Sequence, residues 1–279
     1  MKTTLQSLFG LNGKTIVITG GGGILCGTMA KALGDLGAKV AILDLKPESA
    51  DAVAKQITDV GGSAIGVPCN VLEPSSIQEA AKIVESKFGP IEILINGAGG
   101  NSKTATTGGT TVADLIDPTF FDLDPAGIQF VFNLNFLGTL LPTQVFARDM
   151  VKRKSGVILN ITSMNAFCPL TKIPAYSAAK AAVGNFTQWM AVHFAPANIR
   201  VNAIAPGFFL TEQNRFLLTT NDGGMTPRGE TIISQTPMKR YGTADELIAG
   251  MVYLLSDGAG FVTGTTLAID GGFSAFSGV

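Results

Sequence analysis

The sequence predicts an α/β fold: one domain over residues 1–279, with a doubly wound, mostly parallel sheet and helices on both faces. Short apolar runs rich in Val and Ile alternate with segments of helical periodicity along the whole chain. The loops between them are mostly short, and no break in composition suggests a second domain. Many of the 34 glycines stand where an apolar run ends and a helical pattern begins, as tight turns require.

The elements follow one another in a regular order. Apolar, β-branched runs bounded by turn residues predict strands at residues 15–19, 40–43, 64–68, 91–95, 156–161, 201–204 and 266–269. Helical spacing of apolar residues predicts helices at residues 25–36, 49–60, 75–88, 125–151, 174–194 and 243–255. Two long stretches break the rhythm, an insertion near residues 100–124 and a segment near residues 208–241. Both follow strand ends, where open α/β sheets bind ligands, so we expect the second to be a substrate loop.

Composition narrows the function classes. Hydrophobic residues make up 46% and charged residues 15%, which favours a large core over disorder. The net charge of -1 and the lack of a basic block argue against nucleic acid and anionic membranes as partners. No signal peptide or bilayer-spanning run is recognised, and the three cysteines match no metal spacing. We therefore expect a cytoplasmic protein with a small-molecule substrate and no metal site.

The first strand and helix are joined by a glycine-rich turn. Its residues are Thr19-Gly20-Gly21-Gly22-Gly23, followed by Ile24 and Leu25. Backbone N–H groups in such a turn can approach a pyrophosphate, which the helix N-terminus also stabilises. Asp44 ends the next strand, where a carboxylate accepts hydrogen bonds from the adenosine ribose and repels a 2′-phosphate. The turn contains no Arg, so the sequence favours NAD over NADP as cofactor.

A second group of polar residues follows the later strands. Tyr176 and Lys180 are four apart in a predicted helix and share one face, and Ser163 lies just past a strand end. Further short motifs lie along the chain at Asn96-Gly97-Ala98-Gly99, Asn135, Pro206-Gly207 and Asp270-Gly271-Gly272. With the glycine turn and Asp44, this ordered set resembles the classical short-chain dehydrogenase/reductase (SDR) family over nearly the whole chain, and the resemblance implies a Rossmann-type fold.

The resemblance implies roles for the catalytic residues. Tyr176 would be the general acid in ketone reduction and the base in alcohol oxidation. Lys180 would lower the pKa of Tyr176 and hold the nicotinamide ribose. Ser163 would hydrogen-bond the substrate oxygen, and Asn135 would position a water that passes protons from Lys180 to solvent. The implied cofactor-binding residues are Gly20, Gly22, Gly23, Ile24, Leu25, Asp44, Asn70, Val71, Asn96, Gly97, Ala98, Tyr176, Lys180, Pro206, Gly207, Phe209 and Thr211.

The chain departs from the usual family pattern at several positions. Ile24 and Cys26 stand where the family's glycine turn has its last two glycines, and we expect Gly23 and Gly27 to take over their work. Gly97 stands where the family often has Asn, and Asn70 where it often has Asp.

The long insertion and the segments around it are similar to hexuronate-type members, such as D-mannonate oxidoreductase and fructuronate reductase. We therefore expect reduction of D-fructuronate to D-mannonate. Main rivals are another polyol or sugar-acid dehydrogenase resembling gluconate 5-dehydrogenase, a 3-oxoacyl thioester reductase, and a non-enzymatic dinucleotide-binding scaffold with a vestigial site. Residues at the mouth that can bind a sugar acid are Asn101, Ser102, Lys103, Asn165, Asn214 and Arg215.

Family members commonly form tetramers through the long helices that carry Asn135 and Tyr176. The resemblance thus implies a homotetramer or a homodimer. Phe186 and Trp189 are expected in the core or at subunit contacts, and His193 is expected to be structural or at the surface.

Overall fold

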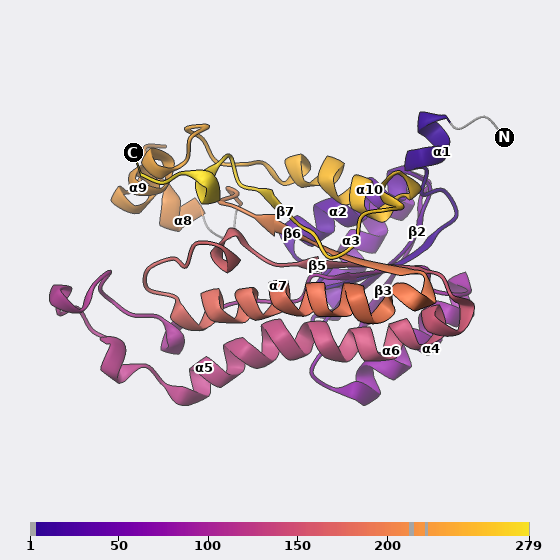
Figure 1. Ribbon diagram of the computed structural model, residues 1–279, viewed down its shortest axis with the longest axis horizontal. Helices are drawn as coiled ribbons and strands as arrows, with labels where there is room; N and C mark the ends of the chain where they lie inside the picture. Colours follow the sequence, from indigo (N-terminus) through magenta and orange to yellow (C-terminus); the bar gives the residue numbers. More distant parts are fainter. Residues whose placement is uncertain (1–3, 212–214, 221–222, 279) are drawn as a thin grey trace.

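The computed structural model describes residues 4–211, 215–220 and 223–278. Its centre is a parallel sheet of seven strands in the order β3-β2-β1-β4-β5-β6-β7 (Figure 1). The strands are β1 (Thr15–Thr19), β2 (Lys39–Asp44), β3 (Ser63–Pro68), β4 (Ile93–Asn96), β5 (Gly156–Ile161), β6 (Ile199–Pro206) and β7 (Thr266–Ile269). The strand order reverses between β1 and β4, which are direct neighbours. The predicted doubly wound α/β fold is confirmed.

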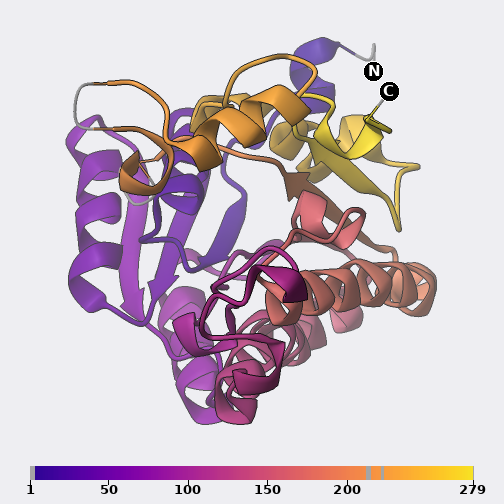
Figure 2. The ribbon, with the colours of Figure 1, turned by 90° about the vertical axis from the view of Figure 1, so that its left-hand side faces the viewer.

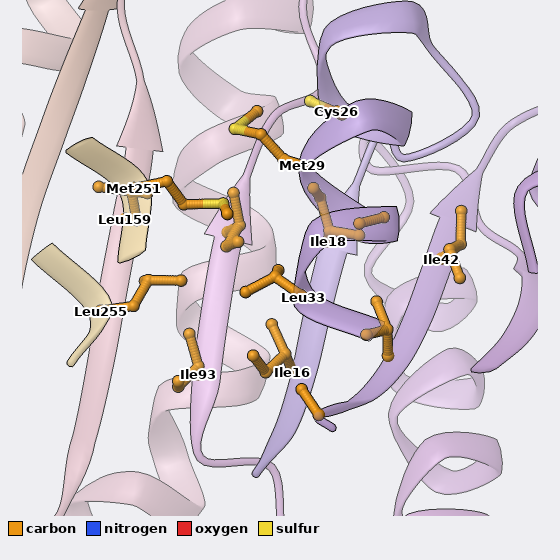
Figure 3. Packing of buried hydrophobic residues seen from close by; sticks show 14 of the residues in the cluster. Ile16, Ile18, Cys26, Met29, Leu33, Ile42, Ile93, Leu159, Met251 and Leu255 are labelled. Carbon is orange, nitrogen blue, oxygen red and sulfur yellow. The ribbon is translucent and has the colours of Figure 1, made fainter. Parts of the chain in front are cut away.

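Helices cover both faces of this sheet. On one face pack α2 (Ile24–Asp35), α3 (Pro47–Asp59) and α10 (Ile248–Leu255), and on the other pack α4 (Pro74–Phe88), α6 (Gly138–Arg153) and α7 (Pro174–Phe194). Neighbouring residues of β1 point to opposite faces, so Ile16 and Ile18 join one apolar cluster and Val17 joins the other. Figure 3 shows the first cluster, in which Met29 and Leu33 of α2 reach the sheet beside Met251 and Leu255 of α10.

The predicted helix at residues 125–151 is built from three pieces. α5 (Pro125–Phe132) is followed by a π-helical turn, η4 (Asn133–Leu137), and then by α6. Asp124 caps α5, since its carboxylate accepts from the N–H groups of Ala126 and Gly127. By length and mean hydropathy the stretch Pro125–Arg153 would pass as a membrane span. Its buried residues Phe146, Ala147 and Met150 instead pack on the sheet, as expected of a core helix.

Several elements were not predicted from the sequence. A short helix, α1 (Leu5–Phe9), precedes β1, and α8 (Arg215–Leu218) and α9 (Pro227–Gln235) lie within the segment expected to be a substrate loop. The insertion contains short 3-10 turns at Lys103–Ala105, Val112–Asp114 and Phe120–Asp122. In Figure 2 the insertion, in magenta, lies beside the start of α7, and the orange segment with α8 and α9 lies across from it. Both segments therefore flank the carboxyl ends of the strands.

Candidate active site

The glycine turn lies where β1 ends, beside the end of β4. Gly20 has a φ of +62°, and a Cβ there would lie 2.8 Å from the Cα of Ala98. A Cβ on Gly21 would lie 2.7 Å from Ile42, and one on Gly22 would lie 2.6 Å from Ser49. Any side chain at these positions would therefore push the turn away from its neighbours, and the turn's backbone can approach a ligand closely only because they are glycines.

Asp44, at the end of β2, is bonded to this turn. One carboxylate oxygen accepts from the N–H of Gly22 at 3.0 Å, and the other accepts from the N–H of Lys46 at 3.0 Å. Each oxygen keeps a lone pair for another donor. The acid thus fixes the turn and still presents acceptors to the space in front of it.

The departures from the family's glycine pattern compensate for one another in space. Gly97 has no Cβ, and one placed there would collide with the sulfur of Cys26 and lie 2.7 Å from the carbonyl oxygen of Thr19. The Cys26 side chain thus occupies the space that a side chain at residue 97 would need. Gly27 brings α2 close to α3, since its Cβ would lie 3.2 Å from Val53. Gly23 is less constrained, because only the Gly20 carbonyl oxygen lies near its missing Cβ, at 3.3 Å.

Ser163, Tyr176 and Lys180 meet at the end of β5. Ser163 precedes the 3-10 turn Met164–Ala166, and its hydroxyl accepts from the N–H of Asn165 at 3.3 Å. Tyr176 and Lys180 lie on adjacent turns of α7, with the Lys180 ammonium 5.7 Å from the centre of the Tyr176 ring. Lys180 donates to the carbonyl oxygen of Ile161 at 2.8 Å, which ties α7 to the end of β5.

Burial shapes the proton affinities of this group. It raises the pKa of Tyr176 to about 12, and the Ser163 hydroxyl offsets part of that rise. Burial lowers the pKa of Lys180 to about 8. Burial and the Ser163 hydroxyl account for the raised pKa of Tyr176, so the expectation that Lys180 lowers that pKa stays a prediction. Burial also raises the pKa of Cys26 to about 12, so its thiol stays protonated near neutral pH.

Asn135 lies on the π-helical turn and is fully buried. Its amide nitrogen donates to the carbonyl oxygens of Gly100, at 2.7 Å, and Val131, at 2.8 Å, while its oxygen accepts from the N–H of Gly100 at 3.3 Å. Gly99 lies between Asn135 and Lys180, since a Cβ there would be 2.7 Å from the Asn135 oxygen and 3.1 Å from the Lys180 ammonium. The absence of a side chain at residue 99 therefore lets these two groups face one common space.

Asn96 does not face that space. Its amide nitrogen donates to the Thr143 hydroxyl at 3.0 Å and to the Asn160 side-chain oxygen at 2.9 Å, and Asn160 donates to Thr187 at 2.8 Å. This ladder of buried polar groups joins α6, β4, β5 and α7. The prediction that Asn96 borders the cofactor is corrected here, because its side chain is buried between sheet and helices. Its oxygen has no hydrogen-bond partner among the described residues.

One cavity of 610 Å³ connects the glycine turn to Ser163, Tyr176 and Lys180. Most of the predicted cofactor residues line it: Gly20, Gly23, Ile24, Leu25, Asp44, Asn70, Val71, Gly97, Ala98, Pro206, Gly207, Phe209 and Thr211. Of the remaining predicted cofactor and catalytic residues, Gly22, Asn96 and Asn135 lie outside its lining. Sequence reasoning missed Cys26, Leu45, Cys69, Gly99, Gly100, Leu134, Ile161, Thr162 and Phe208. Most of these residues adjoin predicted ones at the carboxyl ends of strands. Including every residue that follows a predicted strand would therefore have found them.

The predicted substrate residues Asn101, Lys103, Asn165 and Arg215 are not part of this lining. Asn101 donates to the Thr106 hydroxyl at 3.0 Å, and Lys103 and Arg215 are exposed. The Ser102 hydroxyl accepts from the N–H of Thr104 at 3.3 Å, and Asn214 lies outside the described residues. Asn165 differs from these, being 4% exposed with a side-chain oxygen that has no hydrogen-bond partner among the described residues. Within that same part of the chain, no group of three His, Cys, Asp or Glu residues is placed to hold a metal ion.

Comparisons with known proteins agree with this architecture. A structure from Haemophilus influenzae, solved with bound NAD and bearing the name D-mannonate oxidoreductase, is 53% identical, with a TM-score of 0.92 over 96% of this chain and 98% of that one. The 5-keto-D-gluconate 5-reductase of Escherichia coli is 34% identical over 96% of this chain and 98% of its own. A gluconate 5-dehydrogenase from Burkholderia cenocepacia, solved with NADP and tartrate, is 30% identical, with a TM-score of 0.83 over 98% of this chain and 99% of that one. Residues 14–222 match the family described as short chain dehydrogenase. The chain therefore belongs to the short-chain dehydrogenase family of oxidoreductases.

Proposed function

We propose that this protein is an NAD-dependent oxidoreductase that interconverts the carbonyl and alcohol forms of a sugar acid, with D-fructuronate and D-mannonate as the first pair to test. One observation carries the proposal: a single cavity has the glycine turn and Asp44 at one end and Ser163, Tyr176 and Lys180 at the other. Such a cavity can hold an extended dinucleotide with its reactive ring beside a proton donor.

The residues present fit a dinucleotide. Cβ atoms at Gly20, Gly21 or Gly22 would displace the glycine turn, and its members Gly20 and Gly23 line the cavity just before α2 begins. Asp44 presents carboxylate oxygens to the cavity, which suits ribose hydroxyls and opposes a 2′-phosphate. That argument supports NAD over NADP, although relatives have been solved with each of the two cofactors. The nicotinamide supplies or accepts the hydride, and the chain's residues manage the substrate oxygen and its proton.

In the reducing direction, the Tyr176 hydroxyl donates its proton to the substrate carbonyl oxygen. The raised pKa of Tyr176 keeps the hydroxyl protonated, as a general acid requires. The Ser163 hydroxyl donates a hydrogen bond to the same oxygen and stabilises its developing charge. Tyr176 then regains a proton from solvent through Lys180 and a water that Asn135 would position in the space beside Gly99. In the oxidising direction the same groups carry the proton the other way.

Substrate selection is proposed to lie at the mouth of the cavity. Asn165 is the foremost candidate among the predicted substrate residues, because its backbone N–H donates to Ser163 and its buried side-chain oxygen has no hydrogen-bond partner among the described residues. A sugar acid offers hydroxyl groups that would satisfy it. Lys103 and Arg215 are proposed to attract the substrate carboxylate from the rim. The comparisons support a 5-keto-gluconate as the second candidate substrate.

We also propose a cytoplasmic homotetramer or homodimer. α7 presents an apolar face on which Trp189 is 55% and Val192 is 78% exposed. His193 stacks on Trp189 at the surface, with ring centres 4.5 Å apart. Exposed aromatic area of this kind supports a subunit contact, and sedimentation equilibrium of the purified protein tests it.

The first experiment measures NADH oxidation with D-fructuronate, D-tagaturonate, 5-keto-D-gluconate, a neutral ketose and an acetoacetyl thioester, each also with NADPH. Strong turnover of one hexuronate with NADH supports the proposal, and turnover confined to the ketose or the thioester refutes the sugar-acid assignment. Tyr176→Phe is the matched control: it should bind NADH normally and lose turnover. A scaffold without catalysis would show no turnover in the wild-type protein either.

A further inference from the structure

The first part of the insertion, residues 100–108, is held against the catalytic helix; we refer to it as the strap. It starts at the cavity, where Gly99 and Gly100 form part of the lining. At Gly100 it is bonded in both directions to the side chain of Asn135. Further along, the Thr104 carbonyl oxygen accepts from the N–H of Asp124 at 3.1 Å, just before α5 begins. The strap is thus tied to the two ends of the segment that carries Asn135.

The middle of the strap packs against the catalytic tyrosine. Ala105 is fully buried in a small apolar cluster with Val131 of α5 and Ala179 of α7, against which the ring of Tyr176 also packs. Gly127 of α5 leaves room for the strap, because a Cβ there would collide with the Thr104 side chain. A displacement of the strap would therefore change the packing around Tyr176 directly.

The far end of the strap is bonded to Lys172 and, through the N–H of Gly108, to the carbonyl oxygen of Pro118 at 2.7 Å. The N–H of Thr107 donates to the carbonyl oxygen of Lys172 at 2.9 Å, and the Lys172 ammonium donates to the carbonyl oxygen of Gly108 at 2.8 Å. Lys172 is half-buried, lies two residues before the start of α7 at Pro174, and has a φ of +71°, a left-handed conformation that is uncommon for lysine. Among the described residues Lys172 forms no ion pair within 4.0 Å. Its positive charge contributes only as a minor cause to the lowered pKa of Asp114, after the hydrogen bonds from Thr111 and Thr110. The Lys172 ammonium therefore bonds to the strap and not to a neighbouring carboxylate.

We propose that Lys172 is a positioning residue, which fixes the strap beside Tyr176 and so sets the wall against which the substrate lies. This inference rests on the proposed function, because it concerns the same site. The wall differs from the cofactor's part of the cavity, since the glycine turn and Asp44 make none of the strap's contacts described above. Loosening the strap should therefore weaken substrate use while cofactor binding stays unchanged.

The test compares three substitutions. Lys172→Met removes the bond to Gly108 and should raise KM for the preferred keto acid about tenfold, with the Kd of NADH unchanged. Lys172→Arg should retain most of the wild-type KM, because a guanidinium can donate to the same carbonyl oxygen. Lys154→Met is the matched control: Lys154 is also a left-handed lysine, but it is exposed at the end of α6, and its substitution should change neither constant.

A fourth variant distinguishes positioning from direct binding of the substrate by Lys172. Gly127→Ala pushes the strap from its other side and should reproduce the KM increase. A defect in Lys172→Met that appears with the keto acid but not with a neutral ketose, and that Gly127→Ala does not share, would overturn the positioning role. The same result would favour contact between Lys172 and the substrate carboxylate.

Hydrogen exchange gives a readout that does not depend on turnover. Backbone amides in residues 100–108 should exchange faster in Lys172→Met than in the wild-type protein or in Lys154→Met, because the far end of the strap loses its only bond to the Lys172 side chain and is held less firmly. Unchanged exchange would refute the anchor. If the wild-type protein turned over no sugar acid, the proposed function would fall, and the exchange result would still decide whether Lys172 anchors the strap.

Discussion

Replacing Gly97 with Ala tests how the altered glycine turn is packed. A Cβ at residue 97 would collide with the sulfur of Cys26 and lie 2.7 Å from the carbonyl oxygen of Thr19. The φ of Gly97 is not positive, so the expected penalty is steric and not conformational. Overpacking of this kind costs about 1–3 kcal/mol, and we expect about 2 kcal/mol because one of the two obstacles is backbone. NADH binding should weaken as well, since Gly97 and Cys26 both line the cavity.

Cys26→Ala removes one of the two obstacles. Alone it should destabilise the protein by about 1 kcal/mol through lost packing. In the double variant about half of the Gly97→Ala penalty should be relieved, because the contact with Thr19 remains, so the total loss should be about 2 kcal/mol and not the additive sum of about 3 kcal/mol. The double-mutant cycle should therefore give a coupling energy of about 1 kcal/mol. Gly23→Ala is the control, with a φ of −74° and only the Gly20 carbonyl oxygen at 3.3 Å, and it should cost no more than about 1 kcal/mol, because Ala is a poorer helix N-cap than Gly.

Urea unfolding of the four proteins and the control, fitted with a common slope, measures these free energies. Fluorescence titration with NADH measures the cofactor affinity in parallel. Strictly additive effects in the double variant would refute the reasoning, because the two side chains would then not share one space. A Gly97→Ala protein as stable as Gly23→Ala would refute it more directly.

Three other substitutions test the cofactor preference, the buried lysine and a helix end. Asp44→Ser should raise the ratio of kcat/KM for NADPH to that for NADH about tenfold, because the charge that opposes a 2′-phosphate is gone; an unchanged ratio would remove Asp44 as the determinant. Lys180→Met should abolish turnover yet stabilise the protein at neutral pH by up to about 3 kcal/mol, because burial lowers the Lys180 pKa from 10.5 to about 8. From pH 8 upward the unfolded chain binds more protons at Lys180 than the folded protein, so wild-type stability should approach that of the variant; a gap independent of pH would contradict this. Arg200→Met should cost about 2 kcal/mol in chemical unfolding, because the half-buried guanidinium donates to four carbonyl oxygens at the end of α10 and in the loop beyond it. Arg240→Met, which breaks an exposed ion pair with Glu246, should change stability little, and an equal loss in both would refute the capping role.

The sheet and the residues at its strand ends could be predicted because their signals are local. The apolar run at residues 15–19 and the glycines that follow it predict a strand and a tight turn without reference to any other segment. The spacing of four residues places Tyr176 and Lys180 on one helix face. Parallel strands then bring their carboxyl ends to one edge, which accounts for the grouping of Asp44 with Ser163. These residues could therefore be predicted without information on how distant segments pack.

The features that sequence reasoning missed depend on contacts between distant segments. Asn96 stands at a strand end like its neighbours, but its side chain turns toward Thr143 and Asn160, and alternation along β4 alone does not reveal these partners. The pKa of Tyr176 depends on burial, which the spacing to Lys180 does not report. The strap depends on a bond between Lys172 and Gly108, 64 positions apart, and no local pattern marks it.

The π-helical turn at Asn133–Leu137 has a consequence for how this chain can change over evolution. Such a turn holds one residue more than the regular helix, and each residue of a helix corresponds to a rotation of about 100°. A π turn absorbs its extra residue locally, so losing one residue here would restore a regular helix without rotating α5 about the axis of α6. Ala105 would keep its contact with Val131, whereas Asn135 lies within the turn and would lose its bonds to Gly100. The extra residue is therefore tied to the position of the Asn135 side chain and not to the packing of α5.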